Sequence, residues 1–165
     1  MTAMPSSGTA IVTLPTDEEI LIVREFDAPR HLVYKAWTTP ELIKRWWGGC
    51  RGPVTDAEID LRVGGTWRYV MRAHGEFEVA FHGEYREIVP NERIVTTEVY
   101  EGAPDTGEDP PLNVITFTEI DGRTRLELLT KCPSKTVRDM IIESGMETGM
   151  QESMDELERV AISLI

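Results

Sequence analysis

Few residues in this chain have the types and spacing that catalysis or metal binding requires. The three histidines, His31, His74 and His82, fall on a predicted helix, a turn and the outward side of a predicted strand. Cys50 and Cys132 are far apart and belong to no C-x-x-C motif, so they predict two reduced thiols instead of a disulfide or a zinc site. No G-x-S-x-G or H-E-x-x-H motif occurs. The sequence therefore assigns no catalytic residue and implies no metal or cofactor.

The aromatic and methionine side chains form a more informative group. They are expected to line the space between a sheet and the C-terminal helix, and they are Trp46, Trp47, Trp67, Tyr69, Met71, Phe81, Tyr85, Met146, Met150 and Met154. Methionines and aromatic rings with a few polar tips are common in adaptable small-molecule pockets. The same side chains would also make a dry packed core, which composition alone favours slightly. These ten residues are the candidate ligand-binding residues, with pocket and core both left open.

Polar groups that could take part in a reaction inside that space are few. Tyr69, Tyr85 and Glu98 are the first candidates for an enzyme that guides an already reactive substrate by the shape of its cavity. Arg68 and Arg72 have outward parity on a predicted strand, so they are not assigned as ligand anchors. A shift of one residue in strand register would reverse that assignment. The sequence leans away from enzymatic activity and does not choose catalytic residues.

One long amphipathic helix over residues 136–164 is expected to position the methionines. Its apolar face has small and aliphatic side chains at helical spacing, which are Ile142, Met146, Met150, Leu157, Val160, Ala161 and Leu164. The opposite face has Glu147, Gln151, Asp155 and Glu158, and we expect it to lie in water. The apolar face then needs a partner elsewhere in the chain.

A curved antiparallel sheet is the expected partner of that helix. A first strand at 19–27 precedes two short helices, each with a proline, Pro29 or Pro40, at its start. Period-two runs then predict strands near residues 54–61, 66–73, 77–89, 93–100, 112–119 and 123–131. Ile88 breaks the alternation and predicts a β-bulge near residues 86–87, and Asp121-Gly122 predicts a hairpin turn. The predicted class is α+β, with about six to seven strands.

Length and composition indicate one globular domain. The chain has 165 residues, 41% of them hydrophobic and 28% charged, and we expect a flexible leader at 1–17 before a single domain at 18–165. The leader lacks the basic and apolar regions of a signal peptide, and no apolar run approaches the ~18 residues of a membrane span. The formal net charge of -12 argues against binding to nucleic acid or anionic lipid. The expected location is cytoplasmic.

Several motifs resemble those of one protein family. They are Phe26-Asp27-Ala28-Pro29 with Val33 and Trp37, Thr39-Pro40-Glu41-Leu42, Arg45-Trp46-Trp47-Gly48, Gly64-Gly65-Thr66-Trp67 and Gly83-Glu84-Tyr85. Together they resemble the Hsp90-ATPase-activator-like family (Aha1 C-terminal-like, AHSA1) of the START-like, SRPBCC or polyketide-cyclase-like superfamily, from about residue 20 to residue 164. The resemblance implies a helix-grip fold, in which a strongly curved antiparallel sheet grips the C-terminal helix and leaves a cavity between them.

The resemblance favours a ligand pocket over a dry packed core as the interpretation of these side chains. It also implies a small hydrophobic molecule as the partner. Many relatives have Gly-Trp in the middle of the last helix, whereas Met150 follows Gly149 here, which would change cavity volume and ligand preference. An Hsp90 co-chaperone role is a weaker alternative, because relatives with that role have a further N-terminal domain and only about 18 residues precede the first strand here. A cyclase-like or hydrolase-like enzyme is the third hypothesis, and a homodimer through an edge strand is left open.

Overall fold

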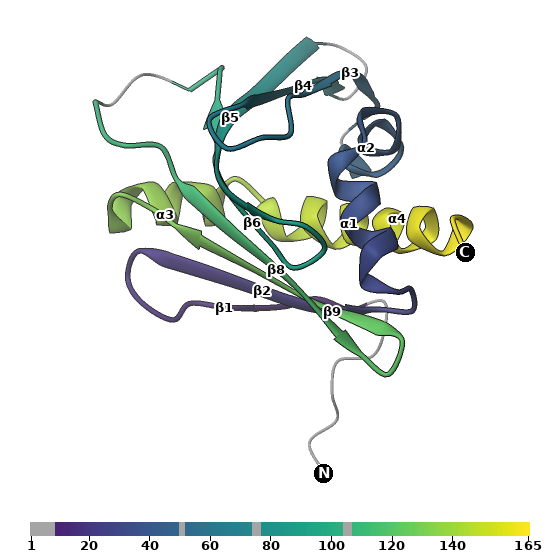
Figure 1. The fold of residues 1–165 in the computed structure, drawn as a ribbon. Coiled ribbons are helices and arrows are strands. Elements are labelled where there is room, and N and C mark those ends of the chain that lie inside the picture. The colour runs from purple at the N-terminus through teal and green to yellow at the C-terminus, as the bar shows by residue number, and fades with distance from the viewer. Residues whose placement is uncertain (1–8, 50–51, 74–76, 104–106) are drawn as a thin grey trace.

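A curved antiparallel sheet dominates the fold, and the C-terminal helix lies against it (Figure 1). The computed structural model describes residues 9–49, 52–73, 77–103 and 107–165. Along the chain the elements are β1 (Ile11–Thr13), β2 (Glu19–Phe26), α1 (Arg30–Thr38), α2 (Pro40–Trp46), β3 (Val54–Ile59), β4 (Thr66–Ala73), β5 (Phe77–Val89), β6 (Arg93–Thr97), β7 (Val99–Tyr100), β8 (Leu112–Ile120), β9 (Arg123–Lys131), α3 (Lys135–Glu143) and α4 (Met146–Ser163). This is the α+β, helix-grip architecture, with a nine-stranded sheet where six to seven strands were predicted.

The strand order places the first two strands beside the last strand at one edge of the sheet. The order is β1-β2-β9-β8-β6-β5-β4-β3, with β7 pairing beside β5. All pairings are antiparallel. The long strand β5 pairs with β4 along one part of its length and with β6 along another, so it joins the two halves of the sheet.

Two local predictions are confirmed. The register of β5 against β6 shifts between Tyr85 and Glu87, which is the bulge expected from the change of parity at Ile88. Asp121 and Gly122 connect β8 to β9 with φ angles of 52° and 78°, and two positive φ angles are what a tight two-residue hairpin needs. The bulge lets one strand serve both halves of the sheet.

The inner face of the sheet, which we define as the side toward α4, is apolar along its middle row. In register across five strands this row contains Ile22, Leu128, Ile115, Ile94 and Ile88. Three of these isoleucines, at positions 22, 94 and 115, are buried. Helices α1, α2 and α4 contact one another and, with the inner face, enclose the main hydrophobic core.

The single C-terminal helix predicted over residues 136–164 is wrong, because two helices occupy that stretch. Helix α3 begins after Ser134, whose hydroxyl accepts a hydrogen bond from Val137 N at 3.2 Å, and it ends at Glu143. Gly145 then adopts φ 81°, a left-handed conformation that helical residues do not have, and α4 begins at Met146. Figure 1 shows the break between the two helices. The apolar spacing continues across Gly145, so the periodicity of the sequence alone does not predict the break between the two helices.

The predicted water-facing side of α4 is also partly wrong, since two of its acids meet a buried arginine. Arg24 Nη1 lies 2.6 Å from Asp155 Oδ1, and Arg24 Nη2 lies 3.0 Å from Glu158 Oε1. The Arg24 side chain is 0% exposed, while those of Asp155 and Glu158 are 39% and 14% exposed. Because an unpaired buried charge is costly, this ion pair ties α4 to β2.

Part of the predicted leader belongs to the sheet. Within residues 1–17, Ile11–Thr13 form β1 and pair with β2. Ala10 is buried, and its backbone exchanges two hydrogen bonds with the side-chain amide of Gln151 on α4, at 3.1 and 2.8 Å. The outermost strand is therefore held by α4 as well as by its sheet neighbour.

Candidate functional site

Six of the ten predicted ligand-binding residues are packed in the main core. These six are Trp46, Trp67, Tyr69, Met71, Tyr85 and Met154. The indole Nε1 of Trp46 donates to the backbone oxygen of Ala36 at 2.9 Å, and Nε1 of Trp67 donates to Thr96 Oγ1 at 2.6 Å. Their polar tips are thus satisfied inside the protein, as buried polar groups generally are.

The other four candidates, Trp47, Phe81, Met146 and Met150, are only partly buried. The Trp47 ring meets Tyr69 and Phe81 with centroids 5.1 and 5.0 Å apart, and both contacts are edge-on. Met150 packs against the main core and against a second cluster formed by Ala10, Ile20 and Ile22. These four half-buried side chains form the border of the interior: Trp47 and Phe81 pack against the main core, Met146 packs against the second cluster, and Met150 packs against both.

Sequence reasoning missed one aromatic member of this border, Tyr100. Its ring stacks on Phe81 at 5.0 Å with 27° between the planes, and 43% of the residue is exposed. The rings of Tyr100, Phe81, Trp47 and Tyr69 therefore form a continuous series from the surface to the core. The alternation of residues 94–100 placed Tyr100 on the inner side, and this parity was the signal that could have identified it.

A row of polar side chains crosses the inner face two residues along from the isoleucine row. In register it contains Thr130, Asn113, Thr96 and Tyr85. Thr130 Oγ1 donates to Asn113 Oδ1 at 2.8 Å, and Asn113 Nδ2 donates to Glu98 Oε1 at 2.9 Å. Asn113 and Thr96 are buried, whereas Glu98 is half-buried. The inner face thus has a hydrogen-bonding end beside its apolar middle.

The structure brings together the three polar residues proposed from the sequence, Tyr69, Tyr85 and Glu98. Burial raises the pKa of Tyr69 well above 10.0, and the nearby Tyr85 and the charge of Glu98 raise it further. Burial also raises the pKa of Tyr85. Both phenols therefore stay protonated at neutral pH, so the inner face offers neutral hydroxyls and one carboxylate. This set can hydrogen-bond a polar group held against the aromatic border.

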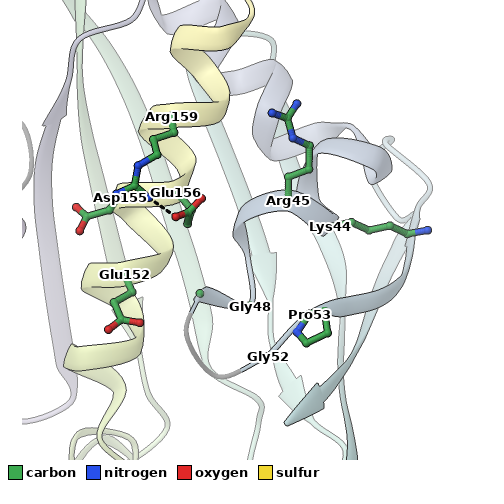
Figure 2. Close-up of a pocket in the computed structure, with 10 residues that line it drawn as sticks. Lys44, Arg45, Gly48, Gly52, Pro53, Glu152, Asp155, Glu156 and Arg159 are labelled. Carbon is green, nitrogen blue, oxygen red and sulfur yellow. Dashed lines mark hydrogen bonds and ion pairs between the residues drawn. The ribbon is translucent and has the colours of Figure 1, made fainter. Parts of the chain in front are cut away.

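Two surface pockets contain none of the ten predicted residues. One, of about 560 Å³, lies between α2, the glycine-rich segment after it and α4, and its lining includes Lys44, Arg45, Glu152, Glu156 and Arg159. Figure 2 shows Lys44 pointing away from α4 and Arg159 paired with Glu156, so these charges do not converge on one point. The other, of about 510 Å³, lies on the outer side of β4 and β5 and includes Arg68 and Glu101.

The remaining chemistry-bearing residues lie outside the inner face. His31 and His82 are exposed, as predicted, and His74 lies outside the described residues. Cys132 is a buried free thiol whose pKa burial raises to about 11, and Cys50 lies outside the described residues. In the described part of the chain no three His, Cys, Asp or Glu side chains gather to hold a metal ion. No helix there is long and apolar enough to cross a bilayer.

Arg68 points outward, as its strand parity predicted, and takes part in a charged cluster. Arg68 Nε and Nη2 donate to Glu101 at 2.9 and 3.0 Å, and His82 Nδ1 lies 2.8 Å from Glu101 Oε2. These hydrogen bonds, that of Arg68 first, lower the pKa of Glu101 to about 2.

We expect Glu101 to titrate with a pKa of about 2, against 4.5 for an ordinary glutamate. Because folding lowers this pKa, the cluster stabilises the protein above pH 4.5, and this contribution is lost as the pH falls from 4.5 toward about 2. Carboxyl ¹³C chemical shifts measured against pH would report the midpoint. Arg68→Gln should move it toward 4.5, whereas Arg72→Gln, on the same outward side of β4, should leave it unchanged. A midpoint near 4.5 in the unmodified protein would contradict the arrangement.

Solved structures share this fold. A protein from Rhodobacter sphaeroides superposes with a TM-score of 0.85 at 20% identity, covering 95% of this chain and 100% of that chain. A protein from Mycobacterium smegmatis gives 0.82 at 23% identity, covering 92% and 96%. An AHSA1-like protein from Aeromonas hydrophila gives 0.63 at 19% identity, covering 84% and 92%. Identities this low establish a common fold and carry no function across.

Comparison at the level of sequence identifies the family. No curated protein matches the chain. The family model described as "Activator of Hsp90 ATPase homolog 1-like protein" matches residues 27–161, which runs from the end of β2 to the last turns of α4. The matched stretch contains the bulged strand β5, the inner-face polar row and the methionines of α4. This chain belongs to the Activator of Hsp90 ATPase homolog 1-like family.

Proposed function

We propose that the protein binds a small lipophilic or aromatic molecule between the inner face of the sheet and helix α4. Trp47, Phe81 and Met150 would form the apolar wall, and Glu98 with Asn113 would form the polar end. The observation that carries the proposal is the half-buried Glu98 carboxylate, hydrogen-bonded to buried Asn113 beside the apolar middle row of the inner face.

A purely structural role accounts less well for that polar row. The members of this row are hydrogen-bonded, so they carry no large penalty, but apolar side chains at the same positions would often be equally or more stabilising. The isoleucine row two residues away shows that this sheet accommodates such side chains. Ligand pockets, in contrast, combine apolar walls with a few placed polar groups. The polar row and its aromatic border have that composition.

Room for the molecule would come from the half-buried methionines. On α4, Met150 packs against both apolar clusters and Met146 packs against the second, and unbranched thioether side chains repack at low cost. The left-handed Gly145 at the start of α4 also leaves α3 joined to α4 by only a short connection. Of the six buried candidates, Tyr69 and Tyr85 would offer their hydroxyl groups to the ligand, and the other four would support the wall from behind.

Native mass spectrometry and thermal shift against a panel of lipids and aromatic metabolites test the proposal. We expect one class of apolar compound to remain bound in the gas phase and to raise the melting temperature further as its concentration rises, because mass action stabilises the folded state by RT ln(1 + L/Kd), with L the free concentration of the compound. A crystal structure with the border filled by protein side chains, together with no shift from any compound, would refute the proposal.

Met150→Trp is expected to weaken binding of any compound found in that panel while leaving stability close to that of the unmodified protein. The larger indole would occupy the space at the junction of the two clusters, where Met150 is only half-buried. If no space existed there, the same change would overpack the interior and cost roughly 1–3 kcal/mol. Urea unfolding and titration of the bound compound separate the two cases. Met140→Trp is the matched control, because Met140 is 53% exposed on α3.

The family description itself supports a second candidate, a stimulating interaction with an Hsp90-type ATPase. The fold is compatible with such a role, although the inner-face polar row plays no evident part in it. Adding the protein to an Hsp90 preparation and measuring ATP hydrolysis tests this candidate, with Glu98→Gln as a variant that should not change the result. An unchanged rate over a range of concentrations would dismiss it.

A further inference from the structure

We propose that helices α1 and α2 form a docking surface for an acidic segment of a partner protein. The surface is made by the Lys and Arg side chains of these two helices, Arg30, Lys35, Lys44 and Arg45, and we call it the basic helix surface. Figure 1 shows the two helices next to each other beside α4, and both of them contact α4. The inference goes beyond the ligand proposed above and does not depend on it.

The charge of α1 and α2 is opposite in sign to that of the chain as a whole. The chain has 17 basic and 29 acidic residues and a formal net charge of -12, but these two helices contain four of the bases and only one of the acids, Glu41. Salt limits charge interactions at a surface to a range of about 8 Å under physiological conditions. An acidic segment is therefore attracted to the basic helix surface and repelled by most of the remaining surface.

The four bases also differ from those elsewhere in the chain because they have no acidic partner. Outside α1 and α2, every Lys and Arg side chain of the described residues except Arg72 and Lys131 forms an ion pair. None of the four forms an ion pair or a side-chain hydrogen bond with a described residue. Three of them are exposed, and Arg30 is half-buried. In a chain so rich in acids, these bases remain available for an acid from outside.

The acids of α4 across from α2 do not neutralise its two bases. Glu152 and Glu156 line the same pocket as Lys44 and Arg45, but Glu156 pairs with Arg159 on its own helix. Figure 2 shows the Lys44 side chain extending away from α4. The positive charge at the end of α2 is therefore directed to the solvent and not to the rest of the protein.

Helix stability explains only part of this pattern. Lys35 lies in the last turn of α1, and the two bases of α2 lie in its last turn, where positive charge interacts favourably with the helix dipole. Arg30, in contrast, is the first residue of α1, where positive charge is unfavourable, and the first turn of this helix contains no acid. Stability alone would favour an acid at this position. Recognition of an acidic partner accounts for the bases at both ends of α1.

Apolar surface beside the bases favours a protein segment over a nucleic acid or an anionic membrane. Trp37 follows Arg30 by seven positions and Leu42 precedes Arg45 by three, so each pair lies on one side of its helix. Trp37 and Leu42 are only half-buried, so they leave apolar surface for a side chain of the partner. A nucleic acid or a membrane is large and uniformly negative, and it would also meet the acids of α4. A short acidic segment avoids them.

Fluorescence anisotropy with the full chain and a fluorescein-labelled peptide, Glu-Glu-Trp-Glu-Glu-Leu-Glu-Glu, tests the inference. The comparison peptide has glutamine in place of every glutamate. We expect the acidic peptide to bind at least about 10-fold more tightly than the glutamine peptide. Its dissociation constant should rise at least about five-fold between about 0.01 M and about 0.15 M salt, because the screening length falls from about 30 Å to about 8 Å.

Variants that remove equal charge locate the binding surface. Replacing all four bases of the basic helix surface by glutamine should weaken binding of the acidic peptide by about 10- to 100-fold, and Lys44→Gln with Arg45→Gln should weaken it by about 3- to 10-fold. Arg72→Gln with Lys131→Gln is the matched control for the double variant, because these two bases also lack a described partner but lie on strands. The control should change binding by less than about two-fold. If the fourfold variant did not fold, the two double variants would decide.

The inference has several results that would overturn it. These are equal affinities for the acidic and the glutamine peptide, no binding of either, and a control variant as weak as the double variant on α2. Tighter binding to an oligothymidylate, or to vesicles of phosphatidylserine and phosphatidylcholine, would overturn the assignment of a protein partner. Binding of the acidic peptide that is lost only when bases of α1 and α2 are removed would support it, whatever the result of the lipid and metabolite panel.

Discussion

Replacing Asp155 and Glu158 together by alanine is expected to lower the free energy of unfolding by about 3–5 kcal/mol, because the change leaves a buried guanidinium without a partner. Arg24 is fully buried, and these two carboxylates accept its hydrogen bonds at 2.6 and 3.0 Å. The second oxygen of Glu158 also accepts from Asp27 N at 2.9 Å, so the double variant loses that contact as well. Urea unfolding followed by circular dichroism would measure the loss.

Two further variants show whether the loss of stability comes from leaving a buried charge without a partner or only from removing two negative charges. Glu152→Ala with Glu156→Ala removes two acids from the same helix, but the described partner of Glu156 is the exposed Arg159, so we expect a change within about 1 kcal/mol. Arg24→Met should cost less than the double variant, because Asp155 is 39% exposed and can be hydrated while Arg24 cannot. A double variant as stable as the unmodified protein would show that the ion pair does not hold α4.

The ion pair matters for function because it fixes where α4 lies over the inner face. Arg24 is on β2, whereas Asp155 and Glu158 are on α4, one to two turns after Met150. Gln151 holds the same helix to Ala10 ahead of β1. With these contacts on one side of the helix, Met146 and Met150 border the second apolar cluster. Loosening them is expected to change the proposed ligand site as well as stability.

The sequence predicts those features of the fold that depend on residues close together in the chain. The parity change at Ile88 required an extra residue in the strand, and the register shift between Tyr85 and Glu87 is that bulge. The Asp121-Gly122 turn and the Ser134 cap likewise depend on residues close together in the chain. Nine of the ten aromatic and methionine candidates gather around the main core, six of them buried in it, whereas Met146 packs against the second cluster.

What the sequence left undecided depends on contacts between distant strands and helices. Asn113 and Thr130 are 17 positions apart, and only the register of β8 against β9 brings them together with Glu98. Arg24 and Asp155 are 131 positions apart, so α4 seemed to have a solvated acidic face until its packing on β2 was known. At Gly145, the apolar spacing of both helices continues through the break, and a permissive backbone residue interrupts one helix without disturbing the pattern.

Gly83→Ala is expected to destabilise the protein by about 3 kcal/mol or more, since no space exists for a methyl group there. A Cβ at this position would lie 1.8 Å from the carbonyl oxygen of Thr97 and 2.5 Å from Trp67 Nε1. The first of these is backbone and cannot turn aside, and the second already donates to Thr96. Gly83 therefore lets the end of β6 approach β5 at the point where pairing passes from β6 to β7.

Gly107→Ala is the matched control for this second stability prediction. A Cβ there meets nothing within 4 Å, and its only penalty is the positive φ of 75°, which costs about 1–2 kcal/mol for a residue with a side chain. A loss at Gly83 no larger than that at Gly107 would show that β5 and β6 can separate freely. Because Thr97 directly precedes Glu98, any separation that accommodates the methyl group should also move the Glu98 carboxylate.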